Sequence, residues 1–407
     1  MFADHERAFT DDTADGRPGQ PPSADLIEGG GPVRRRRTGL AVAVLSGAAL
    51  VGFLLTGPSH ITHPNPGPIP SSEAEPGPDF SVNRVAFTDA DFGYALLSPC
   101  RLSASCEGRW SLQRTTDSGR NWRRVASPLD ARVATSAAVY ARGRHDVALV
   151  IAGVRFVSND AGLTWQKVPL ERIGGSVDAV PPGDEIGYYC PADCSRPLSA
   201  HDPVEGIHHP LRHQPQLTGD PAQLLVAGFV AADQVWLVIG PLTDVPRILH
   251  SVDRGRHWAT VPAPAFDDWF DPTLLLAPDG SQVYLATRGG AQAHVKRVWR
   301  LTDPVNGRWV GAATDGMPLD TIREIRVLPD GELRYADVAG NAWLTEEDAT
   351  RVVPAPRPLL NGRRVNINVG QVVDGVVVAT PAVGLRGDRV LVSTDSARHW
   401  HVHPVPF

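Results

Sequence analysis

The chain has 407 residues, of which 42% are hydrophobic and 21% are charged, and this composition excludes a wholly disordered protein. Its 39 glycines and 37 prolines are typical of many short strands joined by tight turns and argue against an all-helical bundle. The formal net charge of -6 excludes the broad positive field on which nonspecific nucleic-acid binding depends, so no nucleic acid is expected as a partner.

The first 37 residues are polar, rich in Asp, Gly and Pro, and contain only scattered apolar side chains. Such a segment cannot bury enough surface to offset the entropy cost of ordering the chain, so a disordered tail is expected over 1–37. The tail ends in four consecutive arginines, Arg34 to Arg37. They predict that this side of the following segment stays in the cytoplasm.

A transmembrane helix is predicted over 38–57, because Thr38 to Thr56 gives nineteen residues without a charge. That length spans about 30 Å of hydrocarbon as a helix. The segment predicts a single-pass protein of the cell membrane with a cytoplasmic N-terminus and the rest of the chain outside. A cleaved signal peptide, and hence a secreted protein, is the alternative. The long leader, the long apolar run and the lack of a small-residue cleavage site favour a retained anchor.

Residues 58–79 contain repeated prolines, which favour extended polyproline conformations and predict an extracytoplasmic stalk. The stalk leads into the largest part of the chain, 80–407, which reads as one repetitive domain.

A short motif, Ser/Thr-x-Asp-x-Gly-x-x-Trp, recurs in this domain. Three copies are complete, and in a fourth Ala397 replaces the glycine. Successive aspartates lie 43, 93 and 142 residues apart, which are one, two and three units of roughly 45 residues. Degenerate copies are expected at Asp202, at Asp303 and at Glu347 or Asp348, which gives seven units. The residues of the four motifs are Asp117, Gly119, Trp122, Asp160, Gly162, Trp165, Asp253, Gly255, Trp258, Asp395 and Trp400.

These four segments resemble the Asp-box (BNR) repeats of sialidases, of sortilin-type receptors and of the photosystem assembly and stability propellers. A second resemblance to the photosystem-assembly type lies upstream, in Val85 to Ala95 (VAFTDADFGYA). The resemblance covers about 81–407 and implies an all-β fold, a seven-bladed β-propeller with six or eight blades as alternatives. It also implies that the box turns join the third and fourth strands of a blade, on the face opposite the ligand site.

The box residues are expected to be structural. Aspartate can accept N–H bonds across the turn, glycine supplies a positive φ, and tryptophan packs between neighbouring blades. Because Ala397 lacks the tolerance of glycine, the last box is expected to be the most strained or the most open. Closure of the ring is expected to rest on side-chain packing between the first and last blades, without strand exchange.

A ligand-binding loop is predicted on the opposite face, where carboxylates alternate with aromatic side chains. Such a surface suits a glycan, a cationic group or a peptide. The alternative is that Trp269 and Phe270 fill the gap between two blades while the aspartates cap the loop. The candidate ligand-binding residues are Asp267, Asp268, Trp269, Phe270, Asp271, Arg288 and Arg364.

Four cysteines form two local pairs, Cys100 with Cys106 and Cys190 with Cys194, which predict disulfides in an oxidising compartment. A zinc site that combines the second pair with two histidines is the alternative, although the spacing matches no zinc motif. No metal or cofactor is therefore expected. The histidines are His201, His208, His209 and His213.

The sequence favours a non-catalytic binding or assembly module for an envelope or extracellular protein, a peptide or a glycan. The Arg-Ile-Pro motif of sialidases is absent, as are nucleophile-elbow, P-loop and metalloprotease motifs. The alternative is a sialidase-like or other glycoside hydrolase that uses the loop face, and no catalytic residue is assigned.

Overall fold

The computed structural model describes residues 81–98, 110–126, 128, 137–188, 198–216, 225–240, 245–267, 270–289, 294–346, 348–360, 362–381 and 387–406. All of them belong to one compact unit, Ala43–Phe407. The predicted tail, transmembrane segment and stalk, and the four cysteines, lie outside these residues. Within the described ranges, no helix has the length and hydropathy needed to cross a membrane.

Secondary structure in the described ranges consists of strands, most of them in antiparallel meanders. Five sheets have four strands each, in chain order. They are β1 (Ser81–Phe87), β2 (Gly93–Ser98), β3 (Ser111–Thr115) and β4 (Arg123–Val125); β5 (Ala137–Arg142), β6 (Asp146–Ile151), β7 (Val154–Ser158) and β8 (Gln166–Val168); β17 (Thr273–Leu276), β18 (Val283–Gly289), β19 (His294–Asp303) and β20 (Arg308–Gly311); β21 (Ile322–Val327), β22 (Leu333–Asp337), β23 (Ala342–Glu346) and β24 (Arg351–Pro354); and β27 (Ile367–Val373), β28 (Val376–Pro381), β29 (Arg389–Ser393) and β30 (His401–Pro404).

One larger sheet has eight strands in the order β16-β15-β14-β13-β10-β11-β12-β9. Its two halves are joined where β10 pairs with β13, with Gly187 opposite Ala227. The outermost strand β9 is parallel to β12, whereas the outer strand of each four-stranded sheet is antiparallel to its neighbour. The strands are β9 (Arg172–Ile173), β10 (Glu185–Tyr188), β11 (Leu198–Asp202), β12 (Ile207–Pro210), β13 (Leu225–Ala231), β14 (Gln234–Gly240), β15 (Arg247–Ser251) and β16 (Ala259–Val261), and a separate pair is β25 (Leu359–Leu360) and β26 (Arg363–Arg364).

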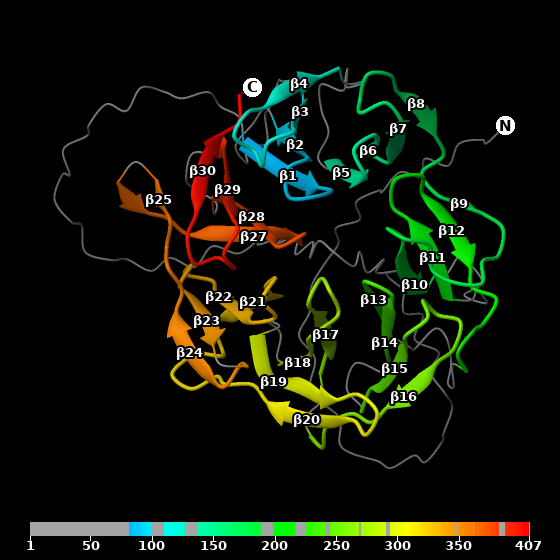
Figure 1. Cartoon of the computed structure of the whole chain (residues 1–407), viewed down its shortest axis with the longest axis vertical. Coiled ribbons are helices and arrows are strands. Elements are labelled where there is room, and N and C mark those ends of the chain that lie inside the picture. Colours follow the sequence, from blue (N-terminus) through cyan, green and yellow to red (C-terminus); the bar gives the residue numbers. More distant parts are fainter. Residues whose placement is uncertain are drawn as a thin grey trace, which may run out of the picture. The chain divides into compact units, whose positions relative to one another are not determined.

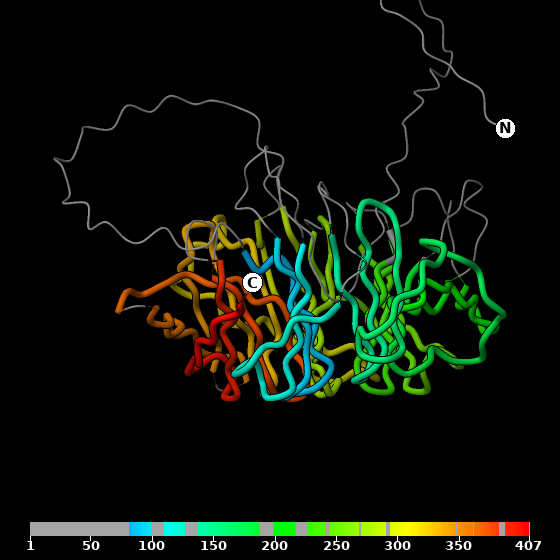
Figure 2. Tube along the Cα trace, turned by 90° about the horizontal axis from the view of Figure 1, so that it is seen from above, coloured from blue at the N-terminus to red at the C-terminus, as the bar shows by residue number. Residues whose placement is uncertain are grey.

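The sheets follow one another around a common centre, which is the arrangement of a β-propeller (Figure 1). The first strand of each four-stranded sheet lies nearest the centre, and the strands run roughly along the axis of the ring when it is seen from the side (Figure 2). Second strands such as β14 are buried along almost their whole length because a sheet covers each of their faces. They therefore read as continuous apolar runs rather than alternating patterns.

Antiparallel meanders sort the connections between the two ends of the ring. Turns between first and second strands and between third and fourth strands lie at one end, which we name the turn end. Connections between second and third strands, and links from sheet to sheet, lie at the opposite loop end. Box motifs therefore fall at the turn end, and Phe270, Asp271 and the end of β18 at the loop end.

The ring closes between β1–β4 and β27–β30, and each of these sheets contains strands of one chain segment alone, as predicted. Side-chain packing between the two sheets is present as predicted, and hydrogen bonds add to it. The Gln371 side chain accepts a hydrogen bond from the Phe87 N–H and donates one to the Phe87 carbonyl, each at 2.7 Å. The Val82 N–H also donates to the Gly387 carbonyl at 2.6 Å. Polar bonds thus supplement an apolar cluster that includes Phe87, Leu97 and Val390.

Candidate ligand-binding site

Each box turn is held by the same set of hydrogen bonds. In the second copy, the Ser158 hydroxyl donates to Asp160 Oδ1 at 2.7 Å and accepts from the Gly162 N–H at 2.8 Å. Asp160 also accepts from the backbone N–H and the hydroxyl of Thr164, at 2.8 and 2.6 Å. These bonds lower the pKa of Asp160 to about 2. The corresponding residues of the other copies are Thr115, Asp117, Gly119 and Asn121; Ser251, Asp253, Gly255 and His257; and Ser393, Asp395, Ala397 and His399.

The box tryptophans contact the preceding sheet. Trp165 Nε1 donates to the Ala126 carbonyl at 2.6 Å, and Trp258 Nε1 donates to the His213 carbonyl at 3.0 Å. Trp309, which follows the degenerate copy at Asp303, donates to the Pro262 carbonyl at 2.7 Å. These carbonyls come shortly after β4, β12 and β16 of the preceding sheet or half-sheet, so each indole links two neighbours.

The last box is as closed as the others. Ala397 has a φ of 63° and is 1% exposed, and its N–H donates to the Ser393 hydroxyl at 2.9 Å. The expectation that this turn could be open is therefore wrong. The positive φ remains, which costs an alanine roughly 1 kcal/mol.

The degenerate copies are stabilised in different ways. Asp202 accepts from the Val204 and Glu205 N–H groups, and Asp303 accepts from the Asn306 N–H at 3.1 Å and its side-chain amide at 2.7 Å. In the β23–β24 turn, Glu347 lies outside the described residues, and Asp348 does not take the box role. Its carboxylate instead lies 3.0 Å from Arg300 NH1.

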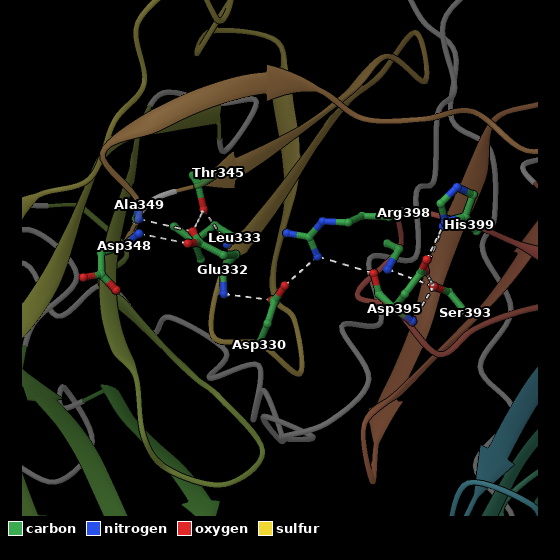
Figure 3. A network of polar contacts seen from close by, with 11 residues as sticks. Asp330, Glu332, Leu333, Thr345, Asp348, Ala349, Ser393, Asp395, Arg398 and His399 are labelled. Atoms are coloured by element: carbon green, nitrogen blue, oxygen red, sulfur yellow. Dashed lines mark hydrogen bonds and ion pairs between the residues drawn. The ribbon is translucent and has the colours of Figure 1, made fainter.

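Glu332, from the neighbouring β21–β22 turn, replaces the box carboxylate there (Figure 3). It accepts from the Asp348 and Ala349 N–H groups at 3.0 and 3.2 Å, and from the Thr345 hydroxyl. Sequence reasoning missed Glu332 because it searched for the carboxylate within the turn itself. At the turn end, these carboxylates are thus engaged in hydrogen bonds that stabilise the turns.

At the loop end, hydrogen bonds tie the predicted ligand-binding segment to the end of β18. The Phe270 N–H donates to the Thr287 hydroxyl at 3.1 Å, and this hydroxyl donates to the Phe270 carbonyl at 2.7 Å. The Arg288 N–H donates to the same carbonyl at 2.9 Å. The structure therefore brings Phe270, Asp271 and Arg288 together.

The remaining predicted ligand residues are not part of this contact. Asp267 is exposed, while Asp268 and Trp269 lie outside the described residues. Arg364 is exposed on β26, which belongs to the separate two-stranded sheet whose β25 strand lies at the periphery of the ring (Figure 1). Phe266 packs against Trp299 with ring centroids 5.1 Å apart, in the apolar cluster between β13–β16 and β17–β20.

Arg288 and Arg323 lie beside this contact, on inner strands of two neighbouring sheets, and Arg326 and Arg334 follow on β21 and β22 towards the turn end. Arg288 NH1 donates to the Arg323 carbonyl at 3.2 Å and so bridges β18 and β21. Burial, together with the charges of Arg326 and Arg323, lowers the pKa of Arg288, and Asp271 opposes this shift. Arg326 lies directly opposite Arg334 in the β21–β22 ladder. We name Arg288, Arg323, Arg326 and Arg334 the arginine group.

One carboxylate lies within the arginine group. Glu324 Oε1 is 3.4 Å from Arg326 Nε, and Glu324 Oε2 is 3.8 Å from Arg334 NH1. The Arg334 side chain is only 4% exposed, and its NH1 has no hydrogen-bond partner among the described residues. Guanidinium groups bind anions through charge-assisted hydrogen bonds, so the arginine group suits an anionic ligand. The sequence signal for half of this group is IREIRV, in which Arg323 and Arg326 are three residues apart.

The predicted histidine group is divided among three places. His201 and His208 lie opposite each other on β11 and β12 and stack with ring centroids 4.4 Å apart. His209 Nδ1 lies 3.0 Å from the Gly175 carbonyl, and His213 Nε2 lies 3.8 Å from Asp178. Over the described ranges, no group of three or more His, Cys, Asp or Glu side chains has the geometry to hold a metal ion.

No protein-family model matches the chain, and no curated protein matches it. Among solved structures, the chain is similar to YCF48 from Cyanidioschyzon merolae at 11% identity and a TM-score of 0.43, covering 83% of this chain and 97% of that one. A structure of YCF48 bound to a D1 peptide shares 14% identity, with a TM-score of 0.30 and coverage of 80% and 81%. The GH74 xyloglucanase from Xanthomonas campestris shares 13% identity, with a TM-score of 0.41 and coverage of 79% and 60%. None of these similarities bears on what the chain binds.

Proposed function

We propose that the chain is a non-catalytic binding module, an Asp-box β-propeller that recognises an acidic segment of a partner protein at its loop end. The blade count that the sheets support is seven, taking the eight-stranded sheet as two blades. The four box turns share one hydrogen-bond pattern, which supports the Asp-box assignment. The uncharged segment 38–57 supports a single anchor that would hold the module outside the cell membrane.

The observation that carries the proposal is the convergence of Arg288 on Arg323 across two sheets, beside Arg326. Half-buried guanidinium groups are only partly hydrated, so an incoming carboxylate replaces little water and gains charge-assisted hydrogen bonds. Aspartate and glutamate side chains, or a chain end, supply such carboxylates. Aromatic side chains near this end, such as Phe270, offer apolar contact for the rest of a peptide.

The geometry gives less support to the alternative of a glycoside hydrolase. Such an enzyme needs two accessible carboxylates across a cleft. Asp184 and Asp202 both lie near Arg142 NH1, at 3.6 and 2.6 Å, but their side chains are only 2% and 9% exposed. They also lie at the turn end. The box aspartates are likewise committed to their turns, since each accepts several hydrogen bonds.

A peptide-binding measurement tests the proposal. The full chain, in detergent micelles, is titrated against a fluorescent Asp/Glu-rich peptide and against its Asn/Gln counterpart. We expect tighter binding of the acidic peptide, weakening steeply with salt. Arg288→Gln and Arg326→Gln should each weaken binding about tenfold, Arg288→Lys less, and Arg124→Gln, on the exposed outer strand of the first sheet, should have no effect. Equal binding of both peptides, or turnover of aryl glycosides by the wild type, would overturn the proposal.

A further inference from the structure

The junctions between neighbouring sheets differ greatly in their apolar content. Six clusters of buried apolar residues contain nine to twelve members each. The cluster between β5–β8 and the β9–β12 half-sheet contains three, Ala148, Val157 and Val204. Among the described residues, this junction therefore contributes the least hydrophobic stabilisation to the ring.

Charged side chains occupy the space that apolar residues fill elsewhere. Arg142, at the end of β5, reaches Asp202 at 2.6 Å and Asp184 at 3.6 Å, and it lies 3.9 Å from Asp146. Both Asp184 and Asp202 are buried, so one guanidinium group balances two carboxylates that have lost most of their hydration.

A second polar layer lies beside this triad. Arg155 is 4% exposed, and its guanidinium donates to the carbonyls of Leu170, Pro203 and Val204. It also lies over the Tyr140 ring, 5.8 Å from the centroid. On the facing strands, Glu185, His201 and His208 form one cross-strand row, with His201 Nδ1 3.8 Å from Glu185.

The opposite side of the β9–β12 half-sheet is joined more firmly. Strand β10 pairs with β13, so the backbone ladder continues into β13–β16. The Val180 N–H donates to the Arg254 carbonyl at 2.8 Å, and Arg254 Nε donates to the Val180 carbonyl at 2.6 Å. An apolar cluster that includes Ile186, Leu198 and Leu237 lies between the same two halves.

We propose that the ring opens at the junction between β5–β8 and β9–β12, and that β9–β16 moves as one sheet when it does. Opening any other junction exposes a large apolar cluster to water, which costs free energy in proportion to its area. Opening this junction instead returns Arg142, its two carboxylates and the histidine pair to water, and the hydration they regain offsets part of the cost. A partial unfolding event separates the elements that are held by the weakest contacts, and here these lie at this junction.

Native-state hydrogen exchange of the full chain, followed by mass spectrometry at pH 7, tests this proposal. Peptides from β5, β6, β10 and β11 should exchange at least tenfold faster than peptides from the equivalent inner strands β21, β22, β27 and β28. Peptides from β14, which pairs with β13 and β15, should be as well protected as peptides from β21, β22, β27 and β28. Uniform protection around the ring, or fastest exchange at another junction, would overturn the proposal.

Two variants test whether the charged groups at this junction determine how readily it opens. Arg142→Gln leaves Asp184 and Asp202 without their counter-charge, so exchange in β5, β6, β10 and β11 should rise a further tenfold, with β21–β24 unchanged. Arg300→Gln is the control, because Arg300 pairs with the exposed carboxylate of Asp348 at an apolar junction. It should not change exchange at the junction between β5–β8 and β9–β12. An equal rise in all strands of Arg142→Gln would contradict the proposal, and the wild-type comparison decides it alone if that variant does not fold.

Discussion

The side-chain amide of Gln371 satisfies both backbone polar groups of Phe87, 284 residues earlier in the chain. Gln371 lies on β27 beside an irregularity in the β27–β28 register, and Phe87 is the last residue of β1. A strand exchanged between first and last sheets would satisfy such groups through backbone pairing. Here one side chain does so, and the two sheets remain separate.

Replacing Gln371 with methionine should therefore destabilise the fold. Methionine keeps the length of the side chain but offers neither donor nor acceptor, so the Phe87 N–H and carbonyl lose their partners. We expect a loss of about 2 kcal/mol in the free energy of unfolding, measured by urea denaturation. Gln166→Met, at an exposed position on β8, is the control and should change stability by less than about 0.5 kcal/mol. A loss no larger than the control's would show that the two Gln371 hydrogen bonds do not stabilise the closed ring.

The glycines of the boxes differ in how much space surrounds them, although all have positive φ. A Cβ added to Gly162 would lie 2.2 Å from Val125 Cγ1, whereas one added to Gly119 would lie 3.4 Å from the Trp122 ring. Gly119→Ala should thus cost only the backbone strain, roughly 1 kcal/mol. Gly162→Ala adds a clash and should cost roughly 3 kcal/mol. Equal losses in thermal melts would show that strain alone sets the cost.

The all-β fold and the positions of the box turns could be predicted from the sequence because both depend on local chemistry. A turn with positive φ requires glycine or a tolerant residue, and strands buried on both faces require apolar runs, so each leaves a trace at fixed spacing. The Ser158–Asp160–Gly162 bonds are of this local kind, since they span four residues.

Contacts between distant segments leave no such trace. Glu332 reaches a turn 13 to 17 residues away, and Gln371 reaches across the closed ring. The arginine group depends on the adjacency of β18 and β21, which appears only after folding. The parallel strand β9 was also beyond prediction, because Arg172 and Ile173, which precede β10 in the chain, take the place of an outer strand beside β12.

Glu332 should be essential for the β23–β24 turn. Its carboxylate accepts three hydrogen bonds (Figure 3). Two of them come from the backbone N–H groups of Asp348 and Ala349, turn residues with positive φ that lie outside the β-ladder. Glu332→Ala should cost about 3 kcal/mol, since bonds to a charged group are worth more than neutral ones. Asp330→Ala is the matched control on the same turn. It loses an exposed ion pair with Arg398 and an exposed hydrogen bond from the Glu332 N–H, and should cost below about 1 kcal/mol. A smaller loss for Glu332→Ala than for the control in urea melts would contradict this role.

Asp184 and His208, at the junction of β5–β8 with β9–β12, should give opposite dependences on pH. Burial, with the charge of Asp202, raises the pKa of Asp184 from its ordinary 3.8 to about 6. The folded state therefore binds this proton more tightly than the unfolded chain, and its stabilising effect is lost as pH rises through 6. Burial, with the charges of His201 and Arg155, lowers the pKa of His208 from 6.5 to about 4. The unfolded chain then takes up that proton first, so His208 costs stability as pH falls from 6.5 to 4.

Replacing Asp184 or His208 should change how the stability of the protein depends on pH. Asp184→Asn mimics the protonated acid, so it should be more stable than the wild type by roughly 2 kcal/mol at pH 8, and this advantage should vanish by pH 4. His208→Gln should gain stability relative to the wild type as pH falls from 7 to 4, because it no longer has a proton to exclude. Thermal melts at pH 8, 6 and 4.5 measure both differences. Asp178→Asn, at a half-exposed carboxylate paired with Arg212, should show no such trend. An Asp184→Asn advantage that grows on acidification would mean that the buried carboxylate is stabilised in its charged form, with Arg142 outweighing both burial and Asp202.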